Sequence, residues 1–177
     1  WELPIGVLID ISAESNLFDI NFGLYSPQGN PITNEDDSGE STNAHYQMLV
    51  TQPGTYYVRV GSLGDGGGGH FELHRTVTAP KKYESGATIK ATNAKPSLQL
   101  FEAKKGKFFY LAIEKNHDIG LALFQPDGKR ANFSTINEPN GRVIIMINPE
   151  VDGNYLLVIT TNDPQTDVKI TTVKVGQ

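Results

Sequence analysis

The sequence of 177 residues contains no cysteine, one tryptophan and two methionines. Without cysteine the chain has no disulfide bonds, thiolate metal sites or cysteine nucleophiles. It also has no apolar run of about 20 residues, which a membrane-spanning helix needs, and no signal-peptide pattern of basic and then apolar residues. A net charge of -5 excludes a general electrostatic attraction to nucleic acids or anionic membranes.

Helical periodicity is nearly absent, whereas turn-forming residues are abundant, with 18 glycines and 10 prolines. Short runs of alternating apolar and polar residues are separated by Gly, Pro, Asn and Asp. This pattern is typical of β-sandwiches and β-barrels. We therefore predict an all-β fold.

The chain also repeats itself. A shift of 99 residues aligns SPQG at 26–29 with QPDG at 125–128, and PGTYYVRV at 53–60 with DGNYLLVI at 152–159. The glycine that ends each Pro-x-Gly turn is expected to have a positive φ. The repeat predicts two tandem jelly-roll-like antiparallel β-sandwich domains, residues 1–79 and 83–177, joined by an exposed linker at 80–82.

The first copy is expected to be incomplete at its N-terminus. GVLIDIS at 6–12 aligns with GKFFYLA at 106–112, which puts Trp1 opposite Phe101. The second copy has further strand-like sequence before Phe101, starting near Tyr83, and the first copy has no counterpart. There are three alternatives. The missing strands lie on an absent upstream piece, the first copy folds without them, or a neighbouring chain adds a strand. We favour a processed or excised chain.

Three short motifs resemble the bacterial pre-peptidase C-terminal domain family. They are Asp-Ile-x-Phe/Leu-x-Leu at 19–24 and 118–123, Pro-x-Gly at 27–29 and 126–128, and Gly-x-Tyr with alternating aliphatic residues at 54–60 and 153–159. The resemblance implies jelly-roll-type sandwiches attached to secreted peptidases and other exported proteins. It also implies non-catalytic domains, some of whose relatives bind collagen or calcium.

An acidic loop at residues 34–40 is the candidate metal site. Calcium takes about six to eight hard oxygen ligands, often carboxylates on a flexible loop. The second copy replaces this loop with FSTINE at 133–138, so the fold does not require an ion there, and a solvated loop is the alternative. The candidate ligands are Asp19, Asn21, Asp36, Asp37 and Glu40.

Exposed aromatic and cationic side chains are the candidate ligand-binding residues. In GTYYVRV, alternation directs Tyr56, Val58 and Val60 inward and leaves Tyr57 and Arg59 on the outer face. Tyr and Arg are enriched at interfaces, although isolated surface tyrosines are also ordinary. The predicted binding residues are Tyr25, Tyr57 and Arg59.

The second copy is apolar where the first copy is polar. The outward positions His45, Gln47, Tyr57 and Arg59 align with Ile144, Met146, Leu156 and Val158. Exposed apolar patches mark interfaces. We expect these four residues to pack on the first copy, an absent domain or another subunit. Burial under an extra sheet layer is the alternative.

Signals for catalysis are weak. His70 and His74 form His-x-x-x-His, but residues four apart on a strand lie about 13 Å apart, too far to share an ion. There is no Gly-x-Ser-x-Gly nucleophile elbow. The glycine run at 64–69 has no following helix with Lys-Ser/Thr, as a phosphate-binding loop needs, so we interpret it as a flexible hairpin loop.

These observations predict a non-catalytic accessory or binding module of an exported bacterial protein, such as a secreted peptidase. We expect it to recognise an extracellular polymer, substrate or cell-surface component. Its expected location is secreted, at the cell surface or in the periplasm. Its expected partners are a catalytic or neighbouring domain of the parent protein and that polymer, and calcium is its candidate cofactor. The alternative is a structural or assembly module with no soluble ligand.

Overall fold

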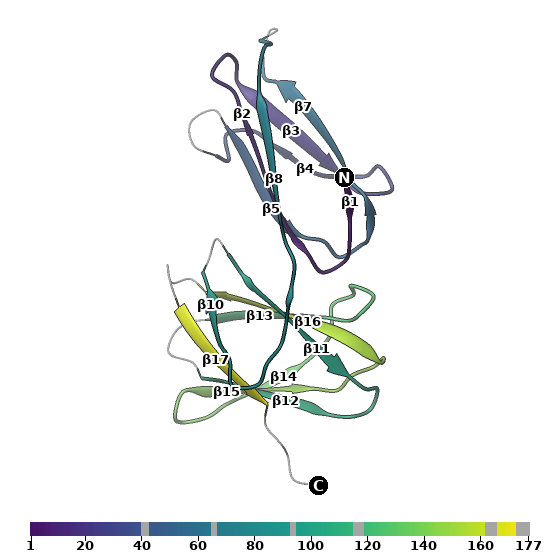
Figure 1. Ribbon diagram of the computed structural model, residues 1–177, viewed down its shortest axis with the longest axis vertical. Coiled ribbons are helices and arrows are strands. Elements are labelled where there is room, and N and C mark those ends of the chain that lie inside the picture. The colour runs from purple at the N-terminus through teal and green to yellow at the C-terminus, as the bar shows by residue number, and fades with distance from the viewer. Residues whose placement is uncertain (40–42, 65–66, 93–94, 115–118, 162–165, 173–177) are drawn as a thin grey trace. The chain divides into compact units, whose positions relative to one another are not determined.

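The computed structural model describes residues 1–39, 43–64, 67–92, 95–114, 119–161 and 166–172. These residues form strands, turns and loops, so the predicted all-β class is confirmed. Jelly-roll connectivity stays a prediction. No helix among the described residues is long and apolar enough to cross a membrane. The chain divides into two compact units, Trp1–Ala79 and Pro80–Gln177 (Figure 1).

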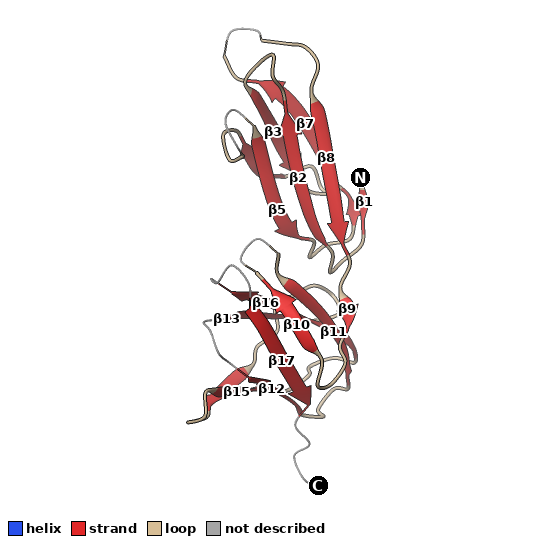
Figure 2. Ribbon diagram, turned by 60° about the vertical axis from the view of Figure 1, so that its left-hand side comes forward, coloured by secondary structure: helices blue, strands red, loops and turns tan. Residues whose placement is uncertain are grey.

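The first unit is a sandwich of two three-stranded antiparallel sheets with the orders β5-β2-β8 and β4-β3-β7 (Figure 2). A separate two-stranded sheet, β1-β6, contains the N-terminal strand. The strands are β1 (Glu2–Leu3), β2 (Leu8–Glu14), β3 (Ile20–Tyr25), β4 (Pro31–Glu35), β5 (Ala44–Leu49), β6 (Gly54–Thr55), β7 (Tyr57–Ser62) and β8 (Glu72–Thr78).

Alternation along the central strands builds the core of the first unit. Every second residue of β2 and β3 turns inward, so that Ile9, Ile11, Ile20, Phe22 and Leu24 are fully buried. The inward set predicted after Gly54 is confirmed. Its members, Tyr56, Val58 and Val60, belong to or pack against this core.

The second unit is a sandwich of a five-stranded sheet, β10-β17-β12-β15-β14, and a four-stranded sheet, β13-β16-β11-β9. Its core gathers inward residues from both sheets, including Leu111, Ile113, Ile145, Leu157 and Ile159. The strands are β9 (Lys81–Lys82), β10 (Thr88–Ala91), β11 (Ser97–Ala103), β12 (Phe109–Glu114), β13 (Ile119–Phe124), β14 (Ser134–Asn137), β15 (Arg142–Ile147), β16 (Gly153–Thr161) and β17 (Thr166–Thr172).

Residues 80–82, which we expected to form an exposed linker, include a short strand. Lys81 and Lys82 form β9 and pair in parallel with Gln99 and Leu100 of β11. Both lysine side chains are exposed, so backbone hydrogen bonds rather than side-chain burial hold this segment to the sheet. Sequence patterns based on side chains therefore give no signal for it.

The two units share a common strand plan. The order β5-β2-β8 corresponds to β15-β12-β17, and the pair β3-β7 corresponds to β13-β16. The repeated motifs contact each other within each unit. A Cβ at Gly54 would lie 3.0 Å from the Pro27 ring, and a Cβ at Gly153 would lie 2.8 Å from the Pro126 ring. The Pro-x-Gly turn thus packs directly on the glycine that opens the next strand.

The glycine run is not a hairpin loop, in contrast to the interpretation from the sequence. It connects β7, which pairs with β3, to β8, which pairs with β2, so the chain crosses from one sheet to the other. Two of its described glycines, Gly67 and Gly69, also lie against neighbouring side chains. A Cβ at Gly67 would lie 2.8 Å from Phe18 Cβ, and one at Gly69 would lie 2.8 Å from Leu17 Cδ1. The absence of side chains lets this connection lie against residues 17–18.

Candidate functional site

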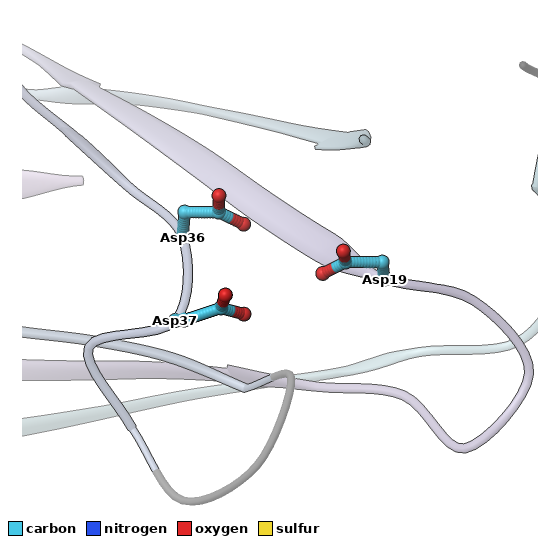
Figure 3. Close-up of side chains that lie close together, drawn as sticks. All are labelled: Asp19, Asp36 and Asp37. Carbon is cyan, nitrogen blue, oxygen red and sulfur yellow. The ribbon is translucent and has the colours of Figure 1, made fainter. Parts of the chain in front are cut away.

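Three aspartates meet at one end of the β4-β3-β7 sheet (Figure 3). Asp19 immediately precedes β3, and Asp36 and Asp37 immediately follow β4. Because β3 and β4 are antiparallel neighbours, the start of one lies beside the end of the other. One carboxylate oxygen from each aspartate lies within 4.8 Å of the other two.

The aspartate cluster is electrostatically unfavourable without a cation. Asp19 and Asp36 are partly buried, and Asp37 is exposed. Asp19 Oδ1 and Asp36 Oδ1 are inaccessible to solvent and have no hydrogen-bond partner among the described residues. Desolvation, followed by the negative charges of Asp37 and Asp19, raises the pKa of Asp36. Buried carboxylate oxygens without a partner carry a desolvation cost, which a bound cation offsets.

The other two predicted ligands stand apart from this cluster. Asn21 is on β3, but its side-chain Oδ1 lies over Gly61 of β7, 2.8 Å from the position of a Cβ there. In the sheet order, β7 and β4 flank β3 on opposite sides, so this oxygen leans away from the strand that leads to Asp36 and Asp37. Glu40 lies outside the described residues.

The predicted binding residues come together on the outer face of the same sheet. Tyr25 of β3 lies directly opposite Tyr57 of β7, and Gly23 lies opposite Arg59. Tyr57 is 55% exposed, Arg59 is exposed and Tyr25 is partly buried. Two phenol rings and a guanidinium group are thus presented side by side on a sheet face.

Gly23 is the residue of this face that the sequence analysis missed. A Cβ at Gly23 would lie 3.1 Å from both Cε2 and Oη of Tyr25. The glycine therefore leaves room for the Tyr25 ring to lie along the strand. A glycine at an outward strand position between apolar residues is the signal that points to such a close approach.

The four apolar residues predicted as an interface do not share one surface. Ile144 and Met146 are on β15 of the five-stranded sheet, whereas Leu156 and Val158 are on β16 of the four-stranded sheet. In each pair the side chains alternate with residues of the core between the sheets, so the two pairs lie on opposite outer faces of the sandwich. Leu156 is only 4% exposed, and the other three are partly buried.

Exposed apolar side chains of the second unit gather instead around Ile144 and Met146. Ile136 of β14 lies opposite Ile144, and Tyr110 of β12 lies opposite Met146. Ile136 is 49% exposed. Phe108, which is 61% exposed, stacks on Tyr110 with ring centroids 6.3 Å apart. Outward alternation in strands β12 and β14 could have revealed these residues.

The described histidines lie at the surface of the first unit. His45 Nε2 is 3.0 Å from Asp10 Oδ1, and His74 Nε2 is 3.1 Å from Glu72 Oε2. His70 is exposed in the loop before β8, and His117 is outside the described residues. His45 and His74 both lie opposite Ser12, on either side of β2.

No protein-family model matches the sequence, and no curated protein is significantly similar to it.

Proposed function

We propose that the chain is a non-catalytic binding module of an exported protein, and that the outer face of the β4-β3-β7 sheet recognises an extracellular polymer. The observation that carries this proposal is the strand register that places Tyr25 opposite Tyr57 and Arg59 opposite Gly23. An open sheet face suits an extended ligand better than a small molecule, which prefers a concave pocket.

The side chains of this face fit such a role chemically. Tyrosine rings offer a large rigid contact surface with a polar hydroxyl, and they lose little conformational entropy on binding. Arg59 adds a fork of hydrogen-bond donors that suits carboxylate or sulfate groups. Polymers with repeating polar and apolar surfaces, such as glycans and protein fibres, present complementary groups.

Binding of the chain to a panel of glycans and fibrous proteins tests this proposal. Tyr57→Ala and Arg59→Ala should each weaken binding to the recognised polymer by at least about fivefold, the range expected for central interface residues. Phe108→Ala is the matched control because Phe108 is similarly exposed but belongs to the second unit. Equal affinity of all four proteins for the bound polymer would contradict the proposal.

Calcium binding by Asp19, Asp36 and Asp37 is a second proposed property of the first unit. It is supported by the two inaccessible carboxylate oxygens without hydrogen-bond partners and by the close approach of the three carboxylates. Calcium prefers carboxylate oxygens and tolerates irregular geometry with additional water ligands. These residues would join the end of β4 to the start of β3 and so stabilise the sheet that carries Tyr25 and Tyr57.

A structural or assembly role is the alternative function, and one observation favours it. Phe108, Tyr110, Ile136, Ile144 and Met146 form an apolar group on the outer face of the five-stranded sheet. Contiguous exposed apolar groups of this kind are typical of protein interfaces. Under this alternative, Ile136→Lys would disrupt a stable protein partnership and leave polymer binding unchanged.

A further inference from the structure

A pocket opens at one end of the β5-β2-β8 sheet, in the first unit. It has a volume of about 320 Å³, within the range of about 300–1,000 Å³ that is typical of small-molecule sites. Residues 14–16, at and after the end of β2, form one part of its wall, and Asn43 and residues 70–72, around the starts of β5 and β8, form another. Most of these side chains are polar or charged, so we expect a polar ligand.

Strand pairing places two glutamates side by side in the pocket. Glu14, the last residue of β2, lies directly opposite Glu72, the first residue of β8. Both side chains are exposed on the outer face of the sheet, because they alternate with the inward-facing Ala13 and Leu73. Glu72 Oε2 lies 3.1 Å from His74 Nε2, whereas Glu14 makes no hydrogen bond or ion pair within the described part of the chain. Like charges directly opposite each other destabilise a sheet, so a cation between them would be stabilising.

The part of the wall that leads into β8 is anchored to the chain that follows β2. The Ser15 hydroxyl donates a hydrogen bond to the carbonyl oxygen of His70 at 3.1 Å and accepts one from the Leu17 amide at 3.2 Å. Gly69 lies against the side chain of Leu17. Phe71, the next residue of the wall, is 41% exposed. The wall is thus formed before a ligand arrives, which lowers the entropic cost of binding.

The lining of the pocket favours an organic ammonium group over a metal ion. Within the described part of the chain, only the aspartate cluster brings three carboxylate or imidazole donors close enough to share an ion, and the pocket's Glu14, His70 and Glu72 do not. An ammonium group donates up to three hydrogen bonds and binds carboxylates strongly through its charge. The ring of Phe71 attracts a cation to its face, and the amide oxygen of Asn43 is a further acceptor.

We propose that this pocket binds a small organic molecule that carries a protonated primary amine. Directly opposed residues of a sheet have Cβ atoms about 4.5–5.5 Å apart, so one ammonium group contacts the carboxylates of both Glu14 and Glu72, and its neighbouring carbon atoms contact Phe71. The site lies on the β5-β2-β8 sheet, whereas Tyr25 and Tyr57 of the proposed polymer-binding face lie on the β4-β3-β7 sheet. Polymer recognition and amine binding can therefore fail separately.

Two matched pairs of compounds test the proposal by NMR titration of the full chain at neutral pH. Glucosamine and glucose differ at one position, where an ammonium group replaces a hydroxyl, and butylamine and butanol differ in the same way on an alkyl body. We expect the amine of at least one pair to bind at least about fivefold more tightly than its neutral counterpart, because its hydrogen bonds are charge-assisted, and to shift the amide signals of Glu14 and Glu72. The amine that binds more tightly shows whether the pocket prefers a sugar or an alkyl body.

Matched substitutions separate the pocket from the overall charge of the chain. Glu14→Gln should weaken amine binding by at least about fivefold, because one of the two carboxylates loses its charge. The melting temperature of the first unit should stay the same or rise, since the repulsion between Glu14 and Glu72 is relieved. Glu84→Gln removes the same charge from an exposed position of the second unit, and Tyr57→Ala alters the polymer-binding face. Both of these variants should bind the amine as the wild-type chain does.

Three results would overturn the proposal. The first is that neither amine binds more tightly than its neutral counterpart. The second is equal amine affinity of the Glu14→Gln and Glu84→Gln variants, which would mark a general effect of charge. The third is a set of shift changes concentrated at Asp19, Asp36 and Asp37, which would place the amine at the aspartate cluster instead of the pocket.

Discussion

The two units share their central strands but differ in the strand that follows the Pro-x-Gly turn. In the first unit β4 pairs with β3 over Phe22 to Tyr25. In the second unit the chain makes one bridge to the corresponding strand, at Phe124 and Arg130, and β14 then pairs with β15 in the other sheet. The strand after the Pro-x-Gly turn thus joins different sheets in the two units, although the turn motifs are similar.

The side chains aligned at Phe133 and Asn34 account for this difference. Ala131 is buried, and Phe133 packs against the core of the second unit, which draws that segment across the sandwich. The aligned residues of the first unit are Ile32, which is 38% exposed, and Asn34, which is exposed. With Asn34 in place of Phe133, this segment has no aromatic side chain to pack into the core, and β4 remains beside β3. Its end then brings Asp36 and Asp37 to Asp19, so the aspartate cluster is a consequence of the strand connection.

The largest expected contrast between the units is in the stability lost when the aligned core residues Val60 of β7 and Ile159 of β16 are truncated. Ile159→Ala should destabilise the second unit by about 3 kcal/mol, because Ile159 is fully buried and its truncation leaves a cavity. Val60→Ala should cost the first unit about 1 kcal/mol or less, because Val60 already contacts solvent. Urea unfolding followed by NMR signals of each unit measures both values. Equal losses would contradict this difference in burial.

Calcium should separate the two units by a similar amount. At a free concentration of about 100 times the dissociation constant, a site selective for the folded state adds about 2.7 kcal/mol. We expect calcium to raise the melting temperature of the first unit and to leave the second unchanged, as followed by differential scanning calorimetry with and without chelator.

Two substitutions make the calcium prediction specific. Asp36→Asn should abolish the response to calcium and, with chelator present, raise the stability of the first unit by removing one of three repelling charges. Asp127→Asn, which changes an aspartate of the second unit paired with Lys129, should leave the response intact. A calcium response that survives Asp36→Asn would exclude this site.

The smallest expected contrast is in the pH dependence without calcium. The folded-state pKa of Asp36 is raised above its ordinary value of 3.8, mainly by desolvation, so its contribution to the first unit weakens as pH rises through that raised pKa. The pKa of Glu138 is lowered from 4.5, mainly by its hydrogen bond with Arg142. Its contribution to the second unit is therefore present above about pH 4.5 and lost as pH falls through the lowered pKa.

Acidification from neutral pH should thus move these two contributions in opposite directions. Unfolding of each unit between pH 7 and pH 3, compared with the Asp36→Asn and Glu138→Gln variants, measures them separately. A wild-type pH profile that each substitution leaves unaltered would refute the two assignments.

Local patterns predicted the local structure well. The glycines of the Pro-x-Gly turns have the expected positive φ, 79° at Gly29 and 82° at Gly128. The inward set Tyr56, Val58 and Val60 also follows from alternation alone. Both features depend on residues adjacent in sequence, which is why one sequence was sufficient.

Features that depend on distant residues were less accessible. The sequence repeat did not reveal that β4 and β14 join different sheets, because this choice depends on how Phe133 packs against residues far along the chain. For the same reason Ile144 and Leu156 were grouped as one interface although their strands belong to different sheets. The glycine run favours a hairpin loop, whereas β7 and β8 belong to different sheets, because loop composition does not specify which strands pair.

The most direct measurement of the proposed function is an NMR titration of the chain with the polymer that it binds. The binding-module proposal predicts that chemical-shift changes concentrate at Tyr25, Tyr57 and Arg59 in the first unit, with the second unit unaffected. Changes concentrated at Ile136, Ile144 and Met146, with the first unit unaffected, would contradict it and assign recognition to the apolar face of the second unit.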